Sequence, residues 1–199
     1  MEFIELSIKN LKEKNNDLYK KIKQEYNYDL VIFIAKGSYL IGKELADLNN
    51  RPLIEIEATR QGGKLKKLLS PILKIIPSKL KLLLRKKELN SNYHKKNSNR
   101  KISFDKNIWN KYKNSKKILL VDDSVDTGYS IKLAKDAIKK YFKDAEIKIA
   151  VYNVFDSSKE IIDIDYNLYQ NTIIKGPWSN DSKEHSKYLK LYKKWKRSD

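Results

Sequence analysis

The chain contains no cysteine and only two histidines, so the residue types that most often form disulfides or bind zinc are nearly absent. Without thiols, neither a disulfide framework nor a thiolate metal site can form. The two isolated imidazoles, His94 and His185, are expected at the surface rather than in a zinc site. No apolar run approaches the roughly 18 residues of a spanning helix, and the N-terminus has no signal-peptide core. These absences favour a protein that is made and kept in the cytoplasm.

Acidic residues are scarce relative to basic ones, and the imbalance is local. The 199 residues include 43 Lys and Arg against 25 Asp and Glu, for a net charge of +18. Residues 64–100 alone hold 12 basic side chains and one acidic side chain, which is more than half of the excess. A chain of 199 residues is long enough for one domain with a sizeable core or for a domain that carries an insertion. The concentrated charge requires its own explanation.

The most informative segment runs from residue 118 to residue 130. Four apolar residues, Ile118–Val121, end at Asp122 and Asp123, and Thr127-Gly128-Tyr129-Ser130 then opens an amphipathic stretch. This pattern predicts a buried strand, a short loop and a helix. Backbone N–H groups and the helix dipole at such a junction suit a phosphate. The adjacent carboxylates can accept hydrogen bonds from vicinal sugar hydroxyls or help to hold Mg²⁺, so a ribose 5-phosphate fits the segment.

Strand and helix patterns alternate along the rest of the chain. The pattern predicts an amphipathic helix over 3–26 and a helix-like segment over 39–48, with a further helix at about 129–143. Apolar segments at 29–35, 52–57, 117–121 and 147–155 predict buried strands. Such alternation indicates an α/β protein with a parallel sheet covered on both faces. Ligands of these sheets lie at the carboxyl ends of strands, where Lys36 and Asp122 are both expected.

Residues 118–130 resemble the PRPP-binding motif of type I phosphoribosyltransferases, where PRPP is 5-phosphoribosyl 1-diphosphate. The resemblance implies the α/β type I phosphoribosyltransferase fold, with a mainly parallel twisted sheet flanked by helices. It implies a single domain over 1–199, with a basic amphipathic helical insertion over 60–101 at the catalytic-loop position and a small hood over 150–180. A receiver domain also begins with a strand ending in Val-Asp-Asp-Ser, but it needs well over a hundred residues after that strand, and only 83 run from Lys117 to Asp199. An ordinary strand–turn–helix without a ligand is the third interpretation.

The same resemblance implies roles for individual residues. Asp122 and Asp123 would hold the ribose hydroxyls and, partly through water and PRPP, the cofactor Mg²⁺, and with Asp126 as general base they form the expected catalytic set. Lys36 matches the basic residue of a diphosphate loop whose preceding peptide bond is often cis, so Ala35–Lys36 is the candidate for that bond. The full set expected to bind PRPP is Lys36, Gly37, Ser38, Arg60, Asp122, Asp123, Ser124, Val125, Asp126, Thr127, Gly128, Tyr129 and Ser130.

The acceptor is the least determined part of the expected reaction. Ile174–Trp178 is similar to an aromatic-bearing strand end of bacterial xanthine-guanine members, but Phe155 falls near the place of their purine-reading lysine. Lys175 could substitute, so the expected acceptor-binding residues are Phe155, Lys175 and Trp178. The missing lysine and the insertion favour a glycan or polyprenyl-linked acceptor, because the arrangement resembles phosphoribosyltransferases of surface-polysaccharide pathways. The alternatives are purine salvage (xanthine or hypoxanthine-guanine) and a PRPP-fold regulator that binds nucleic acid.

The basic insertion has several interpretations of its own. Residues 64–87 predict two or three short helices with leucines and isoleucines roughly on one face. That face either packs on the core or lies, with its lysines, on an anionic membrane surface or a lipid-linked substrate. Nucleic acid is disfavoured because the segment has no interleaved aromatic residues. The protein is therefore expected to be cytoplasmic, with a possible peripheral place on the inner membrane face, and relatives suggest a possible homodimer.

Overall fold

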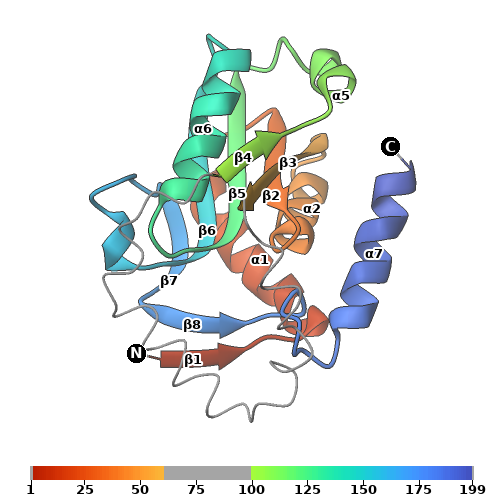
Figure 1. Cartoon of the computed structure of the whole chain (residues 1–199), viewed down its shortest axis with the longest axis vertical. Helices are drawn as coiled ribbons and strands as arrows, with labels where there is room; N and C mark the ends of the chain where they lie inside the picture. The colour runs from red at the N-terminus through yellow and green to blue at the C-terminus, as the bar shows by residue number, and fades with distance from the viewer. Residues whose placement is uncertain (1, 61–99, 199) are drawn as a thin grey trace. The chain divides into compact units, whose positions relative to one another are not determined.

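The computed structural model describes residues 2–60 and 100–198 of the chain (Figure 1). Chain contacts divide the protein into two compact units, residues 1–58 with 102–199, and residues 59–101. The expected helices of the basic insertion fall within 61–99 and lie outside the described residues. The elements in chain order are β1 (Glu2–Glu5), α1 (Ile8–Lys23), β2 (Leu30–Ala35), α2 (Tyr39–Leu48), β3 (Leu53–Arg60), β4 (Arg100–Ser103), α5 (Lys106–Lys111), β5 (Lys117–Val125), α6 (Tyr129–Tyr141), β6 (Glu146–Val154), the 3₁₀ turn η2 (Asp156–Ser158), β7 (Tyr166–Gln170), β8 (Thr172–Lys175) and α7 (His185–Ser198).

The main sheet has six strands in the order β4-β3-β2-β5-β6-β7. β2 lies between β3 and β5 and pairs with both in parallel, and β6 pairs in parallel with β5 and β7. In this register Phe33 of β2 is opposite Val121 of β5, so the two strands end side by side. The α/β class and the mainly parallel sheet are confirmed.

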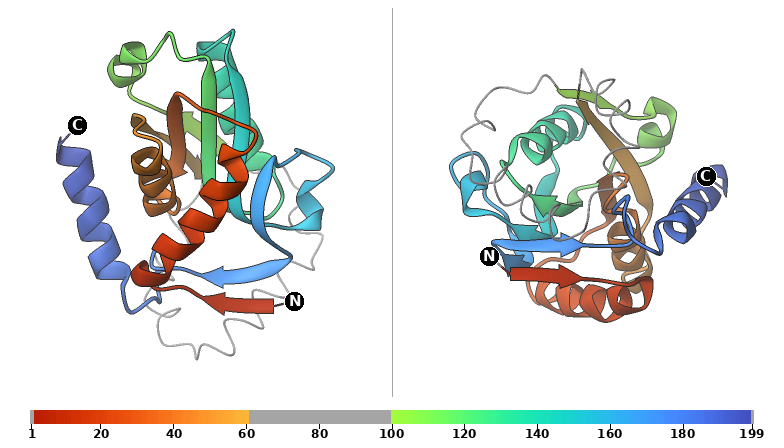
Figure 2. Two further views of the ribbon diagram at one scale, coloured as in Figure 1. Left: turned by 180° about the vertical axis from the view of Figure 1, so that it is seen from behind. Right: turned by 60° about the horizontal axis from the view of Figure 1, so that its bottom comes forward.

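Alternate residues of the central strands point to opposite faces of the sheet and enter two separate apolar cores. Val31 and Phe33 pack with side chains of α1, α2 and α7, whereas Leu30 and Ile32 pack with side chains of α5 and α6. Figure 2 shows α1 and α2 on the face opposite α6. Because β2 and β5 are buried on both faces, they read as continuous apolar runs, as parallel strands commonly do.

The N-terminal segment differs from its expected form. The helix predicted over 3–26 begins only at Ile8, where Ser7 and Asn10 form a capping box. The residues before it form β1, which pairs in parallel with β8 in a separate two-stranded sheet. Residues Glu2–Glu5 form a strand rather than the start of the helix because their partner β8 comes from the other end of the chain. The region expected as a hood over 150–180 begins inside core strand β6 and contains β8. The two-stranded sheet that β8 forms also includes the N-terminal strand β1.

The C-terminal helix α7 was not anticipated from the sequence. It carries six Lys and Arg residues and no acidic residue, and it buries Tyr188 and Tyr192 against the core. Within residues 2–60 and 100–198, no helix combines the length and the apolar character that crossing a membrane requires.

Candidate active site

The loop after β2 lies beside the carboxyl end of β5, because the two strands are parallel neighbours. Ser38 fixes this loop across both strands: its Oγ donates to the carbonyl oxygen of Ile34 at 2.7 Å and to that of Val121 at 3.1 Å. The peptide bond between Ala35 and Lys36 is cis, as the resemblance to phosphoribosyltransferases implied. The structure thus brings together the two segments that sequence analysis chose for PRPP, residues 36–38 and 122–130.

Gly37 is required by a close approach between these segments. A Cβ atom added to Gly37 would lie 2.7 Å from Oδ1 and 3.1 Å from Cγ of Asp123. Asp123 is half-buried and faces this loop rather than the apolar core, while the Lys36 side chain is exposed. A glycine after strand β2 therefore lets the backbone pass directly against Asp123.

The two acids lie in a poorly hydrated place. Asp122 is 9% exposed, and its Oδ1 accepts the backbone N–H of Asp123 at 2.9 Å. Burial raises the pKa of Asp122 well above its usual range, and the charge of Asp123 raises it further. Burial also raises the pKa of Asp123, whereas the neighbouring side chains of Asp122 and Trp178 lower it. Keeping both carboxylates charged is thus unfavourable in the free protein, and hydroxyl donors or a cation would stabilise the charged pair.

This donor set fits Mg²⁺ bound together with a phosphorylated substrate. Mg²⁺ commonly uses one or two carboxylates and completes its octahedron with water and substrate phosphates. In the part of the chain that the structure describes, no cluster of three or more His, Cys, Asp and Glu side chains could hold a metal alone. Asp122 and Asp123 would therefore hold the ion together with water and oxygens of the substrate.

The segment after the acids leads into the start of α6, where a phosphate could bind. Gly128 occupies the N-cap position with φ 82°, a left-handed conformation that glycine adopts without strain. A Cβ there would lie 3.0 Å from Cγ2 of Ile162 and 3.1 Å from Cβ of Ile161. The first turn of a helix presents N–H groups without intrahelical partners, and its dipole favours an anion. Thr127 and Ser130 flank the glycine as half-buried hydroxyls.

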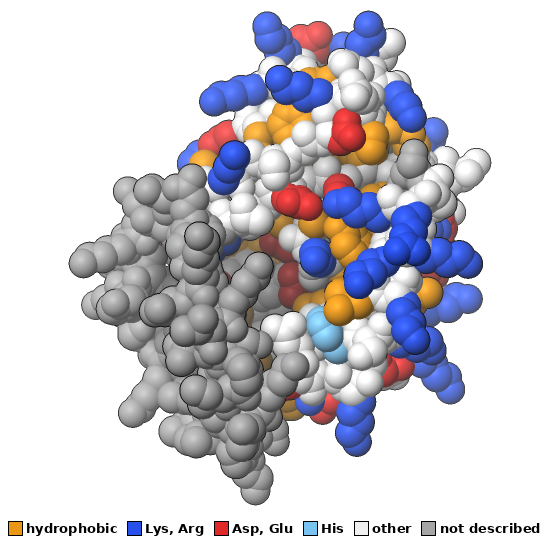
Figure 3. Space-filling view, turned by 45° about the vertical axis from the view of Figure 1, so that its right-hand side comes forward, with side chains coloured by type: hydrophobic (Ala, Val, Ile, Leu, Met, Phe, Trp, Pro, Cys, Tyr) orange, Lys and Arg blue, Asp and Glu red, His pale blue; other side chains and the backbone are white. Residues whose placement is uncertain are grey.

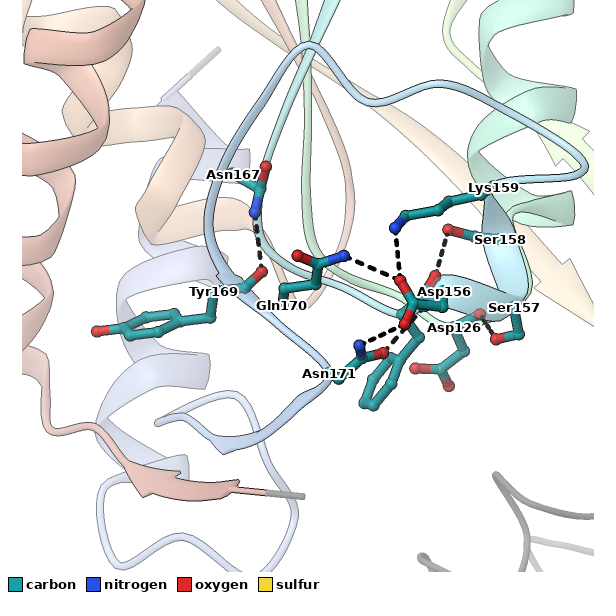
Figure 4. A network of polar contacts seen from close by, with 10 residues as sticks. Asp126, Asp156, Ser157, Ser158, Lys159, Asn167, Tyr169, Gln170 and Asn171 are labelled. Carbon is teal, nitrogen blue, oxygen red and sulfur yellow. Dashed lines mark hydrogen bonds and ion pairs between the residues drawn. The ribbon is translucent and has the colours of Figure 1, made fainter.

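A polar network fixes the loop after β6 beside the start of α6 (Figure 4). Asp156 accepts from Lys159 Nζ at 2.7 Å, from Gln170 Nε2 at 2.9 Å and from Asn171 Nδ2 at 2.6 Å. These partners, Lys159 first, lower the pKa of Asp156 to about 2. The adjacent Ser157 donates its Oγ to the carbonyl oxygen of Asp126 at 2.6 Å. The network therefore connects the turn between β7 and β8 to the backbone of Asp126, the expected general base. No sequence motif predicted this connection.

The residues expected to bind the acceptor lie in three different settings. Phe155 is 5% exposed, and its backbone N–H donates to the carbonyl oxygen of Val125 at 3.0 Å. Lys175 pairs with Glu5 of β1 at 3.0 Å. Trp178 is half-buried, contacts the rings of Tyr152 and Tyr188, and lies close enough to Asp123 to lower the pKa of that carboxyl. Trp178 is thus the member of this set that lies at the acid pair, and roles for all three in acceptor binding stay predictions.

Several other sequence-based expectations meet the limits of the described chain. Arg60 ends β3 in the smaller compact unit, and its side chain is not among those the structure describes. His94 likewise lies outside the described residues, whereas His185 is half-buried at the start of α7. Tyr188 is a further residue that sequence reasoning missed, because only the fold brings α7 to the 36–38 loop.

The charge of the described surface suits an anionic ligand. Figure 3 shows Lys and Arg side chains along much of the described part of one face, with a few acidic side chains between them. A basic surface of this kind raises the local concentration of polyanions and speeds their association at low salt.

Comparisons with known proteins agree with this geometry. Residues 6–184 match the model of the phosphoribosyl transferase domain family. Similar solved structures include a purine phosphoribosyltransferase from Pyrococcus horikoshii, with a TM-score of 0.61, 20% identity, and coverage of 90% of this chain and 96% of that one. The xanthine-guanine-hypoxanthine phosphoribosyltransferase of Helicobacter pylori has a TM-score of 0.60 and 16% identity over 95% and 97% of the two chains. A hypothetical protein from Neisseria gonorrhoeae with bound ppGpp has a TM-score of 0.64 and 14% identity over 97% of each chain. At these identities the likeness concerns the fold, and the comparison with curated proteins gives no match.

Proposed function

The chain belongs to the phosphoribosyl transferase family, and on that premise we propose that it transfers the phosphoribosyl group of PRPP to a purine base. Release of pyrophosphate from PRPP is the activity of the family, and the purine acceptor is the part proposed here. One observation carries the proposal: the 36–38 loop, the acid pair Asp122–Asp123 and the start of α6 all meet at the carboxyl ends of β2 and β5. Together they offer separate sites for a diphosphate, a diol and a 5-phosphate.

Each chemical need of the reaction then has a candidate residue. The amides of the 36–38 loop would bind the diphosphate, Asp122 and Asp123 the ribose hydroxyls, and the start of α6 the 5-phosphate. When bound, Mg²⁺ supplies positive charge for the departing pyrophosphate. A ring nitrogen of the base forms a bond to C1 as the bond from C1 to the diphosphate oxygen breaks. Asp126 would take the proton that this nitrogen loses.

Two observations support a purine as the acceptor. The similar solved structures with named activities act on purines, and another holds ppGpp, a guanine nucleotide. Trp178 lies at the acid pair with its ring against Tyr152 and Tyr188. A planar base beside C1 of the ribose would find an aromatic surface there, and aromatic rings commonly stack on bases.

A glycan or polyprenyl-linked acceptor is the second candidate, and the surroundings of Phe155 favour it. A purine site gains much of its selectivity from a donor that pairs with the exocyclic oxygen of the base. Phe155 is buried near the place of that donor. The next lysine along the chain, Lys159, and the candidate substitute Lys175 are already engaged, with Asp156 and Glu5 respectively. A membrane role for residues 64–87 would belong to this candidate.

The test offers purified protein Mg²⁺, PRPP and hypoxanthine, guanine, xanthine or adenine, and follows nucleotide and pyrophosphate. We expect nucleotide from at least one of these bases. We expect Asp126→Asn to slow turnover by about 10²–10⁴-fold, as loss of a general base does. Asp136→Asn is the matched control, because this carboxylate lies on the exposed side of α6 and pairs only with Lys132 at 3.4 Å among the described residues.

The outcomes separate the two acceptors. PRPP binding without transfer to any of the four bases would reject the purine proposal. Pyrophosphate release on addition of a polyprenyl-phosphate glycan in vesicles would then establish the second candidate.

A further inference from the structure

The C-terminal helix contacts the diphosphate loop through a single hydroxyl. Tyr188 of α7 donates its O–H to the carbonyl oxygens of Lys36 and of Gly37, the second at 2.9 Å. These contacts join positions that are 152 and 151 residues apart in the chain. No other side chain among the described residues binds the carbonyls of the two loop residues, whose remaining partner is the backbone N–H of Tyr39 on Lys36 at 3.1 Å.

The ring of Tyr188 is held as firmly as its hydroxyl. The residue is 1% exposed, and its ring makes edge contacts with Tyr39 at 6.3 Å and with Trp178 at 6.4 Å between centroids. Burial raises the pKa of Tyr188, with a further rise from the charge of Asp123, so the hydroxyl keeps its proton throughout the physiological range. Tyr188 is therefore a permanent donor in a fixed position.

Binding these carbonyls also orients amide groups. In a trans peptide the N–H points away from the C=O of the same plane. The peptide bonds after Lys36 and after Gly37 are trans, since the cis bond of the described chain lies before Lys36. The N–H groups of Gly37 and Ser38 are consequently directed away from the Tyr188 hydroxyl. Among the described residues, neither amide donates a hydrogen bond to the protein.

We propose that Tyr188 is a positioning residue for PRPP: it holds the two carbonyls so that the amides of Gly37 and Ser38 are presented to the diphosphate. This inference rests on the proposed function only through PRPP binding and is independent of the acceptor. It makes α7 part of the site, because the same helix contacts the ring of Trp178, which lies beside Asp123. The helix therefore supports both the diphosphate loop and the acid pair.

The test compares the variant Tyr188→Phe with the full wild-type chain in calorimetric titrations. The ligands, each with Mg²⁺, are PRPP, pyrophosphate and ribose 5-phosphate. Phenylalanine keeps the ring contacts and removes only the hydroxyl. We expect the Kd for PRPP and for pyrophosphate to rise about tenfold, the scale of one or two hydrogen bonds, and the Kd for ribose 5-phosphate to stay within about twofold.

Tyr28→Phe is the matched control. Tyr28 is also 1% exposed, and its hydroxyl also donates to a backbone carbonyl, that of Leu45 at 2.7 Å near the far end of α2. We expect it to lower the unfolding midpoint as much as Tyr188→Phe does, with no change in any of the three Kd values.

Three results would overturn the inference. They are unchanged affinity in Tyr188→Phe, equal weakening of all three ligands, and the same loss of pyrophosphate affinity in Tyr28→Phe. Absence of purine transfer, with PRPP binding intact, would reject the purine acceptor and not this inference, because the titrations contain no base.

Discussion

Gly37→Ala tests the site geometry most directly, because the added methyl group would occupy space that Asp123 now fills. The new Cβ would lie 2.7 Å from Oδ1 and 3.1 Å from Cγ of Asp123, both well inside van der Waals contact. The φ of Gly37 is not among the positive values of the described chain, so the alanine backbone itself is unstrained. The side chain of Asp123 is short and must rotate away from the loop or push it outward.

The expected loss is one carboxylate contact to the ribose. A hydrogen bond to a charged group contributes about 1.5–3 kcal/mol, so kcat/KM for PRPP should fall about 10- to 150-fold. The free energy of unfolding should change by less than about 1 kcal/mol, because replacing glycine restricts the unfolded chain and offsets part of the crowding. Pyrophosphate release at varied PRPP and a thermal melt measure the two quantities.

Gly42→Ala is the matched control five positions further along the same segment. Its Cβ would lie 2.9 Å from Cβ of Phe33 and 3.2 Å from Cδ1 of Leu53, inside the core rather than at the site. Overpacking of this kind costs about 1–3 kcal/mol, and the better helix propensity of alanine returns about 1 kcal/mol. Stability should therefore fall while kcat/KM holds. A Gly37→Ala enzyme with a kcat/KM within about twofold of wild type would refute the placement of Asp123 at the substrate.

Three further predictions concern charge and backbone conformation. Asp122→Asn should abolish turnover and raise the unfolding midpoint. Burial and the charge of Asp123 raise the folded-state pKa of Asp122, so the wild-type protein loses stability as pH rises through that pKa and the variant does not. A difference between the two melting midpoints that narrows with rising pH would contradict this prediction. Gly128→Ala should lower the free energy of unfolding by about 1–3 kcal/mol, because φ is 82° and Cγ2 of Ile162 would lie 3.0 Å from the new Cβ. The variant should also bind ribose 5-phosphate more weakly in titrations. An unchanged denaturation midpoint would contradict the left-handed conformation at this helix start. Asp156→Asn should lower the unfolding midpoint by the same amount at every pH from about 8 to about 5. The pKa of Asp156 is lowered to about 2, so the stabilisation by its charge disappears only as pH falls through that value. A difference between wild-type and variant midpoints that changes between about pH 6 and about pH 8 would contradict the network.

The core strands and the central motif could be predicted from local pattern alone. Strands buried on both faces are continuous apolar runs, and the runs at 29–35 and 147–155 differ from β2 and β6 by about one residue at either end. The strand predicted over 117–121 extends further, to Val125, so Asp122 and Asp123 belong to the strand itself. Hydroxyls and a glycine after two acids signal a ligand because few structural reasons collect those residue types at a strand end.

Long-range pairings could not be predicted in the same way. β1 is a strand because β8 pairs with it, although Glu2–Glu5 and Thr172–Lys175 are at opposite ends of the chain. The network of Asp156 depends on a turn, with Asn171 at φ 53°, that no motif marks. These features arise from contacts between residues far apart in sequence, and composition or periodicity carries no record of such contacts.

By itself the sequence determined which residues are the candidates for the chemistry, since an acid pair, a glycine and hydroxyls at strand ends are a local pattern with a local physical reason. Only the tertiary structure decided how they are assembled: that Gly37 lies against Asp123, that Trp178 lies beside the acid pair, and that Tyr188 of α7 binds the loop of residues 36–38. The cause is geometric, because parallel strands place their carboxyl ends together only once the sheet has formed. A tyrosine 152 residues from its acceptor becomes a neighbour only through that packing.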